Sequence, residues 1–251
     1  MKVSIVTVCL NSETTIRDTI ESVLAQTYPD IEYIIVDGQS KDNTVAIIHE
    51  YQDRIAKVIT EPDEGIYDAM NKGIAQATGD VIAILNSDDF YLNNEVIAQA
   101  VAAFQKVARV DMVLGGVEFV NGEDADKIVR CYKSTGFKPW KLRFGLSPPH
   151  PGAFIRREAY NQVGTYKLKY KIGADFDFFV RSLLVHKLNY ITTDKIWVRM
   201  NVGGVSTLGF QSYKVSTYEM LRSFKQNKRY TNCFFILLRL PLKTLQLIRR
   251  E

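Results

Sequence analysis

Short runs of apolar residues alternate with amphipathic stretches along the first hundred residues of the chain. Four runs rich in β-branched side chains predict buried strands, at 3–8, 31–36, 57–59 and 80–85. Between them, apolar positions recur at helical spacing and predict helices, at 11–26, 41–51 and 65–77. We predict that Asn11 or Ser12 caps the first of these helices. Apolar strands separated by helices favour a parallel sheet covered on both faces.

The second half of the chain has a less regular pattern. Strands are predicted at 111–120, 127–132 and 152–155, and helices at 175–184, 211–226 and 233–250. A proline-rich loop at 147–151 precedes the last strand, and a glycine-rich loop lies at 203–206. No repeat or low-complexity tract interrupts the pattern, so one compact domain fits the 251 residues.

Composition and charge exclude several classes of protein. The 46% hydrophobic and 24% charged residues are typical of a folded chain, and three widely spaced cysteines disfavour a disulfide framework or a zinc site. No signal peptide is recognised, and no apolar run reaches the length of a transmembrane helix. The net charge of +4 arises in the tail, where residues 219–251 hold eight Lys/Arg against two Glu. Nucleic acid binding would require a basic body, so we set it aside.

Acidic residues follow two of the predicted strands. The strand at 80–85 runs through Asn86 and Ser87 into Asp88 and Asp89, and Asp37 follows the strand at 31–36. Parallel sheets bind ligands beyond the carboxyl ends of their strands. Adjacent carboxylates there would suit Mg²⁺ or Mn²⁺ bound with substrate phosphates, and Asp37 could accept hydrogen bonds from a base or ribose. The alternatives are a turn or helix cap for Asp88 and Asp89, and a turn for Asp37.

Two further segments could carry chemistry. Asp175 and Asp177 lie among aromatic residues, where desolvation makes a carboxylate a stronger base, although a helix N-terminus would also favour them. They are two residues apart, so only one of them is expected to face a cleft. His150, in the proline-rich loop, is either a contact to substrate or a solvated loop residue.

Taken in order, these segments resemble a known family. Its members are the family 2 glycosyltransferases with the GT-A fold, in particular the bacterial enzymes of capsule, O-antigen or exopolysaccharide biosynthesis. The resemblance covers roughly residues 1–205 and is carried by the segments 3–11, 22–28, 34–44, 63–74 and 83–89. It implies an α/β fold with a Rossmann-like, mostly parallel central sheet, helices on both faces and additional C-terminal helices. We expect a nucleotide-sugar-binding half at 1–110, an acceptor half at 111–210 and basic helices at 211–251.

The resemblance also implies roles for individual residues. Asp37 matches the carboxylate that holds the nucleotide base, Asp88 would face the ribose and donor sugar, and Asp89 would bind the metal. Asp175 matches the catalytic base, although Ala174 stands where a Glu often precedes it, and Asp177 is the fallback for that role. Three further positions match contacts to the nucleotide, the acceptor side and a loop over the donor, namely Asn71, His150 and Gly204.

The implied function is that of an inverting, metal-dependent glycosyltransferase. It would use Mn²⁺ or Mg²⁺ to move a sugar from a nucleotide-diphosphate sugar, with UDP favoured, to a glycan or polyprenyl-diphosphate-linked acceptor. One alternative is a sugar-phosphate nucleotidyltransferase, for which segment 9–16 lacks the glycine- and arginine-rich phosphate loop. The other is a non-catalytic, membrane-docked scaffold with the same fold.

The last twenty residues predict a helix lying in a membrane interface. Arg239, Lys243, Gln246 and Arg250 fall in one stripe of a helical wheel, while the other positions are mostly Leu, Ile or Phe. Pro241 should kink this helix. We therefore expect a cytoplasmic protein that contacts the inner face of the membrane through residues 232–251; the alternative is a terminal helix packed on the domain.

Overall fold

The computed structural model describes residues 1–121, 124–201 and 209–240. Its strands are β1 (Val3–Cys9), β2 (Ile31–Asp37), β3 (Lys57–Thr60), β4 (Val81–Asn86), β5 (Asp89–Tyr91), β6 (Met112–Asn121), β7 (Asp124–Tyr132), β8 (Ala153–Arg156) and β9 (Tyr190–Asn201). Its α-helices are α1 (Ile16–Leu24), α2 (Thr44–His49), α3 (Ile66–Gln76), α4 (Val96–Lys106), α5 (Arg157–Val163), α6 (Ala174–Val180), α7 (Gly209–Gln226) and α8 (Cys233–Leu237). A 3₁₀ helix, η2 (Pro139–Phe144), completes the part of the chain used below.

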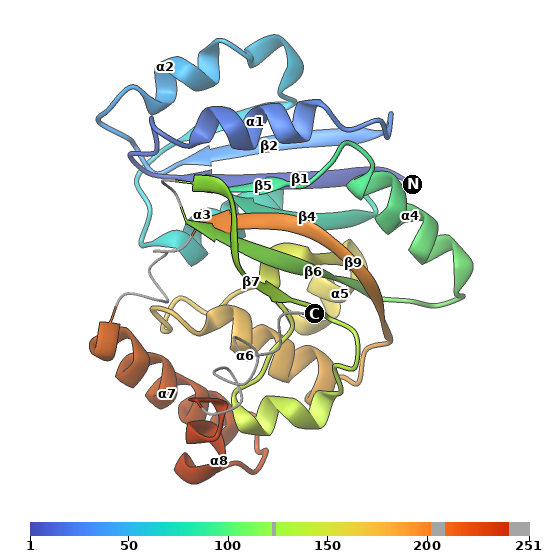
Figure 1. Cartoon of the computed structure of the whole chain (residues 1–251), viewed down its shortest axis with the longest axis vertical. Coiled ribbons are helices and arrows are strands. Elements are labelled where there is room, and N and C mark those ends of the chain that lie inside the picture. The colour runs from blue at the N-terminus through green and yellow to red at the C-terminus, as the bar shows by residue number, and fades with distance from the viewer. Residues whose placement is uncertain (122–123, 202–208, 241–251) are drawn as a thin grey trace.

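One mixed sheet runs through the molecule in the order β3-β2-β1-β4-β8-β6-β9-β5, with β7 paired to β6 (Figure 1). Strands β3, β2, β1 and β4 are parallel to one another. Their register places Asp37 beside Cys9 and Thr60, while Asn86 lies beside Val8. The carboxyl ends of these strands therefore share one edge of the sheet, which confirms the expected α/β architecture.

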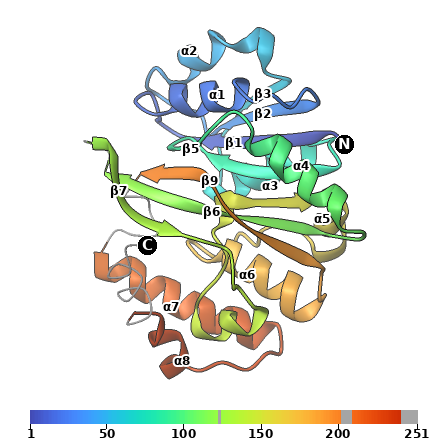
Figure 2. The ribbon, with the colours of Figure 1, turned by 45° about the vertical axis from the view of Figure 1, so that its right-hand side comes forward.

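Helices cover both faces of the sheet, as Figure 2 shows from a second side. Alternate residues of β1 supply the two cores: Val3 and Ile5 pack with α1, α2 and α4, whereas Val6 and Val8 pack with α3, α5 and α6. The alternation follows from strand geometry, since successive side chains point to opposite faces. Phe224 of α7 belongs to the second core, so α7 is part of the folded body.

Two local predictions differ from the structure. The first helix begins at Ile16, and the backbone carbonyl of Ser12 accepts the amide N–H groups of Thr15 and Ile16 at 3.0 and 2.9 Å. Asn11 adopts a left-handed conformation (φ 51°), and its side chain accepts a hydrogen bond from the Lys41 amide at 2.9 Å, so it is not a cap. The second difference is that β5, β9 and α5 have no counterpart among the predicted elements. Strand β5 forms because β9, which is distant in the sequence, pairs with it.

The C-terminal prediction is wrong for Arg239. Its side chain is 2% exposed, its guanidinium lies 4.2 Å from the ring centre of Tyr213, and it donates hydrogen bonds to Ser216 and Thr217 at 2.9 and 2.8 Å. Arg239 therefore fastens the chain after α8 to α7 and does not belong to an exposed basic stripe. The other members of that stripe, together with Pro241, lie outside the described residues.

Figure 1 places α7 and α8 together at the end of the molecule opposite α1 and α2. Within the described ranges, none of the helices has the length and apolarity needed to cross a lipid bilayer. The expected divisions of the chain after residues 110 and 210 stay predictions.

Candidate active site

The carboxyl edge of the parallel strands gathers the predicted nucleotide-binding residues. Asp37 ends β2 and is fully buried, and its carboxylate accepts hydrogen bonds from the Ser40 hydroxyl at 2.5 Å and the Ser40 amide at 3.1 Å. A side chain at Gly38 would come within 2.6 Å of the Asp63 carboxylate, so Asp63 lies directly beside this turn. Lys72 holds Asp63 through an ion pair of 2.8 Å. The edge thus presents two carboxylates side by side.

Asp88 and Asp89 follow β4 at the same edge. Asp89 is 1% exposed, while Asp88 is partly open to solvent. Burial raises the pKa of the Asp88 carboxyl, and burial together with the charge of Asp88 raises the pKa of Asp89 well above its ordinary range. Neighbouring residues fix the turn: Ser12 and Ser87 share a hydroxyl hydrogen bond of 2.8 Å, and Asn201 donates to the Asp88 carbonyl at 3.1 Å.

The chemistry of this turn fits a divalent cation. Asn86 donates to an Asp89 oxygen at 3.0 Å, and its own side-chain oxygen is buried without a hydrogen-bond partner. Two adjacent carboxylates and an unpaired amide oxygen are hard oxygen ligands of the kind that Mg²⁺ and Mn²⁺ prefer. In the described part of the chain, no group of three or more His, Cys, Asp or Glu is arranged so that it could hold a metal ion by itself. Oxygen atoms of a bound substrate would therefore complete the coordination.

Asp175 lies in the first turn of α6, partly exposed, and contacts α3. One oxygen of its carboxylate accepts hydrogen bonds from the Phe176 amide at 2.7 Å and from the Tyr67 hydroxyl at 3.2 Å. The single proton of this hydroxyl is shared with the carbonyl of Ile172, which is also within hydrogen-bond distance. Because α3 begins just beyond the carboxyl end of β3, Tyr67 places Asp175 on the same side of the sheet as Asp37.

His150 is buried behind Asp175 and is not a solvated loop residue. Its Nε2 atom lies 2.6 Å from the Tyr166 hydroxyl, and the whole side chain is 8% exposed. Burial lowers the pKa of His150, and the nearby negative charge of Asp175 opposes that change. A buried, neutral histidine that is hydrogen-bonded to a tyrosine can fix the orientation of the side chains near Asp175.

Asp177 has a different environment, because its side chain is fully buried and its carboxylate is surrounded by protein partners, which include the partly exposed Lys167 at 3.4 Å. Arg181 pairs with it at 2.8 Å, and hydrogen bonds come from Ser223 at 2.7 Å, Asn227 at 3.0 Å and Tyr170 at 3.2 Å. Burial acts against the charged form, but these hydrogen bonds and the Arg181 charge outweigh it and lower the pKa of Asp177. Its carboxylate is therefore occupied with holding α6 to α7.

Two other residues, Asn71 and Gly204, were predicted to contact the substrates. Asn71 was predicted to contact the nucleotide, and in the structure its side-chain amide makes two hydrogen bonds with the backbone of Tyr166, at 2.7 and 2.9 Å. It thereby ties α3 to the loop after α5. Gly204 and its loop lie outside the described residues.

Three residues near the site were not singled out in the sequence: Tyr67, Tyr166 and Glu219. Tyr67 lies within the segment 63–74 that carried the family resemblance, so it had a usable signal. Tyr166 and Glu219 had none, because the first lies in a loop two residues after Gly164 and the second occupies one polar position in an amphipathic helix. Only the packing of α7 against α6 brings Glu219 to the backbone before Asp175.

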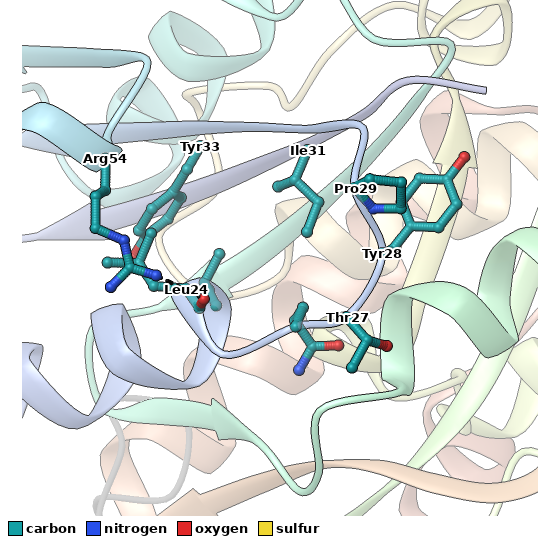
Figure 3. Close-up of a pocket in the computed structure, with 9 residues that line it drawn as sticks. Leu24, Thr27, Tyr28, Pro29, Ile31, Tyr33 and Arg54 are labelled. Atoms are coloured by element: carbon teal, nitrogen blue, oxygen red, sulfur yellow. Dashed lines mark hydrogen bonds between the residues drawn. The ribbon is translucent and has the colours of Figure 1, made fainter.

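A hollow of about 320 Å³ lies at the opposite edge of the sheet (Figure 3). It is formed where α1 ends and β2 begins, and Figure 3 shows Leu24, Tyr28, Ile31 and Arg54 around it. Arg54 donates to the Leu24 carbonyl at 2.9 Å within it. Ile31 and Asp37 are the two ends of β2, so this hollow is separate from the candidate active site.

The sequence itself matches known proteins. The family model of glycosyl transferase family 2 matches residues 4–164, which hold Asp37, Asp88, Asp89 and His150. The chain belongs to glycosyl transferase family 2. An uncharacterized glycosyltransferase of Mycobacterium tuberculosis is 36% identical over 188 residues, which cover 73% of this chain and 69% of that protein. A PGL/p-HBAD biosynthesis glycosyltransferase of Mycobacterium bovis is 30% identical over 71% of this chain and 68% of its own length.

Solved structures show the same fold as this family 2 chain. The Staphylococcus aureus protein TarS (residues 1–349), in complex with UDP-GlcNAc, superposes with a TM-score of 0.69 at 21% identity, covering 89% of this chain and 66% of its own. A mannosyltransferase of Pyrobaculum calidifontis, in complex with GDP-Man and Mn²⁺, gives 0.66 at 17% identity, covering 92% of this chain and 65% of its own. The chain thus spans just under two thirds of either structure, and at these identities the likeness concerns the fold.

Proposed function

We propose that this family 2 glycosyltransferase moves a sugar, with inversion, from a nucleotide-diphosphate sugar to a hydroxyl of a glycan or polyprenyl-diphosphate-linked acceptor. The proposal rests on one observation. Four carboxylates, those of Asp37, Asp88, Asp89 and Asp175, lie toward the carboxyl ends of the parallel strands. UDP is the favoured nucleotide, supported by the UDP-GlcNAc complex of the structural neighbour TarS. Cell-surface polysaccharide biosynthesis is the proposed context.

The proposed reaction uses one carboxylate as a general base. Asp175 takes the proton of the acceptor hydroxyl while that oxygen attacks the anomeric carbon, and the bond from this carbon to the diphosphate breaks on the opposite face. The electron pair of the broken bond stays with the nucleotide diphosphate, and the single displacement inverts the stereocentre. Tyr67 donates a hydrogen bond to one Asp175 oxygen and leaves the second oxygen for the acceptor.

The donor is proposed to lie along the carboxyl edge of the strands. Asp37 and Asp63 would face the base and ribose, and Asp88 the ribose and donor sugar. Asp89, supported by Asn86, would hold Mn²⁺ or Mg²⁺, which supplies positive charge against the negative charge of the departing diphosphate. The sequence contains no glycine-rich phosphate-binding loop that could hold the diphosphate in place of the metal.

Thermal unfolding with a panel of nucleotide sugars, with and without Mn²⁺, tests donor binding. A donor at 100 times its dissociation constant should stabilise the native state by about 2.7 kcal/mol. Product analysis then separates the functions: sugar transfer supports the proposal, and pyrophosphate release would identify a nucleotidyltransferase. A protein that binds donors yet neither transfers nor hydrolyses them would be a non-catalytic scaffold.

The variant Asp175→Asn tests the proposed base. We expect turnover to fall ~10²–10⁴-fold, the usual contribution of a general base, because an amide cannot accept the proton. Donor affinity, measured by calorimetry, should stay close to that of the unmodified protein. Turnover within a few-fold of normal would show that another group accepts the proton.

The proposal also includes contact with an anionic membrane through a surface that we call the η2–α8 surface. It consists of five exposed apolar residues, which are Trp140 (56%), Tyr230 (64%), Phe234 (67%), Leu237 (40%) and Leu240 (47%). Phe144 and Phe235 stack beneath it with ring centres 5.0 Å apart and join η2 to α8. Its exposed neighbours Lys138, Arg143, Lys228 and Arg229 are basic, and neither η2 nor residues 227–240 contain an acidic side chain. Aromatic residues rimmed by cations suit the interface of an anionic bilayer.

A further inference from the structure

The segment that carries Asp175 is held from one face of α7. Glu219 and Ser223 lie on α7 and Asn227 is the residue directly after it. The spacing of four residues places the three in a single polar stripe. Each contacts the segment 171–177: Glu219 binds its backbone, while Ser223 and Asn227 donate to Asp177 at 2.7 and 3.0 Å. The stripe therefore engages both sides of the residue proposed as the base.

Glu219 makes the most specific of these contacts. Its carboxylate accepts hydrogen bonds from three consecutive amide groups, those of Lys171 at 2.7 Å, Ile172 at 3.0 Å and Gly173 at 2.8 Å. The side chain is 5% exposed, so water does not compete for these bonds. An ionised carboxylate has acceptor atoms and no donor. The side-chain amide of a glutamine would instead point its NH₂ group at one of the three backbone N–H groups.

The same turn is held from its other side by α3. The Tyr67 hydroxyl donates to the Ile172 carbonyl and reaches Asp175 at 3.2 Å. Ile172 thus has its N–H bound by Glu219 and its carbonyl bound by Tyr67. A Cβ atom on Gly173 would lie 3.3 Å from the Glu219 carboxylate, which shows how closely α7 approaches this backbone. The turn before Asp175 is fixed between two helices.

We infer that Glu219 is a positioning residue that sets the place of Asp175 by binding the three amide groups before it. The inference rests on the proposed function, since Asp175 matters as the base of that reaction. A displacement of about 1 Å at a reacting group can lower turnover 10²-fold, so loss of the Glu219 bonds should act on the chemical step. Glu219 does not contact Asp37, Asp88 or Asp89 in any hydrogen bond described above, so donor binding should change little.

The test compares the full chain with Glu219→Gln, Glu219→Asp and the control Glu158→Gln, which alters an exposed carboxylate of α5. Turnover and donor dissociation constant are measured for each protein, and hydrogen exchange is followed in the peptide that contains residues 167–178. We expect Glu219→Gln to lower turnover about 10–100-fold, with donor affinity within about twofold of normal. Exchange should accelerate in the 167–178 peptide and not elsewhere. Glu219→Asp keeps the acceptor atoms and should recover part of the turnover, while the control should behave normally.

Two results would overturn the inference. One is normal turnover in Glu219→Gln at a temperature where the protein stays folded. The other is faster hydrogen exchange throughout the chain together with the loss of both donor affinity and turnover. That result would mean that Glu219 stabilises the whole fold and does not specifically position Asp175. If the unmodified protein transfers no sugar, the proposed function fails, and the exchange of the 167–178 peptide still decides whether Glu219 holds this segment.

Discussion

Asp88 and Asp89 are adjacent in the sequence, yet their surroundings differ. Asp89 is 1% exposed and accepts a hydrogen bond from Asn86, while Asp88 is partly open to solvent. Burial raises the pKa of both carboxyl groups, and for Asp89 the negative charge of Asp88 adds to the effect. In the absence of a cation, a charged Asp89 therefore costs folding free energy, because its ionised form is less favourable in the native state than in the unfolded chain.

The variant Asp89→Asn should separate stability from function. A raised native pKa means that stability is fully present below the ordinary pKa of an aspartate and is lost as the pH rises through the raised value. At neutral pH the neutral amide removes this loss, so we expect the melting temperature of the metal-free protein to rise by about 2–4 °C, equivalent to ~1 kcal/mol. Mn²⁺-dependent stabilisation by the donor should disappear.

Calorimetric melting with and without Mn²⁺ and donor provides the measurement, and Asp53→Asn, at an exposed position, serves as the control. Donor binding that still responds to Mn²⁺ in Asp89→Asn would contradict the assignment of the metal ligand. A fall in the melting temperature of the metal-free variant would show that the charged form of Asp89 is favoured in the native state.

At the scale of elements, α6 depends on its neighbours for its position. Asp177 pairs with Arg181, which directly follows α6, and accepts hydrogen bonds from Ser223 of α7 and from Asn227, the residue after α7. Arg181 in turn donates to the backbone carbonyls of Val163, Gly164 and Thr165, beside the end of α5. One buried ion pair therefore connects α5, α6 and α7. Removing one partner of such a pair leaves an uncompensated charge in the core.

The variant Asp177→Asn should consequently act on stability. We expect the free energy of unfolding to fall by about 3–5 kcal/mol, because Arg181 would remain buried and charged without its carboxylate. Chemical denaturation measures this loss, and Asp175→Asn, at a partly exposed position, is the matched control, expected to change stability much less. An Asp177→Asn protein with normal stability and strongly reduced turnover would instead move the base two residues along the chain.

At the scale of the whole molecule, the η2–α8 surface lies at the end opposite α1 and α2 (Figure 1). Residues from two distant parts of the sequence form it, since η2 ends at Phe144 and α8 begins at Cys233. The Thr231 hydroxyl donates to the Arg143 carbonyl at 2.6 Å and fixes the approach of the two segments. A membrane bound by this surface would meet aromatic and basic side chains together.

Sedimentation with vesicles tests this surface. The double variant Trp140→Ser, Phe234→Ser should bind vesicles of phosphatidylcholine and phosphatidylglycerol several-fold more weakly, since it loses two large apolar side chains. Binding of the unmodified protein should weaken at high salt, because ions screen its basic residues. Tyr218→Ser, which alters an exposed aromatic residue of α7, is the control.

Equal vesicle binding by the double variant and the unmodified protein would contradict the proposed surface. Deletion of residues 232–251 should release the protein from membranes while its donor-binding body stays folded. Ile236 is fully buried and Arg239 is 2% exposed, so some loss of stability should accompany the deletion. Unfolding or aggregation of the truncated chain would show that these residues belong to the core and would count against the membrane proposal.

The sequence alone determined strands β1 to β4, the helices between them and the acids at the carboxyl ends of β2 and β4. Strands β1, β2, β3 and β4 follow from local patterns, because burial on both faces selects continuous apolar runs and short polar turns end them. In parallel strands those turns share one edge, so the proximity of Asp37 and Asp88 could also be foreseen. The order of the motifs then identified the family.

The tertiary structure decided which polar residues remain free for chemistry. Asp175 and Asp177 lie two residues apart in one aromatic segment, and the resemblance favoured Asp175 without excluding Asp177. Packing against α7 buries Asp177 with Arg181, while Asp175 stays partly exposed. Arg239 follows the amphipathic pattern of a surface helix, yet Tyr213 and two hydroxyl groups of α7 bury it. Glu219 gave no signal at all. Hydrogen bonds and ion pairs between distant elements depend on where those elements meet, and a local pattern of polar and apolar residues does not contain that information.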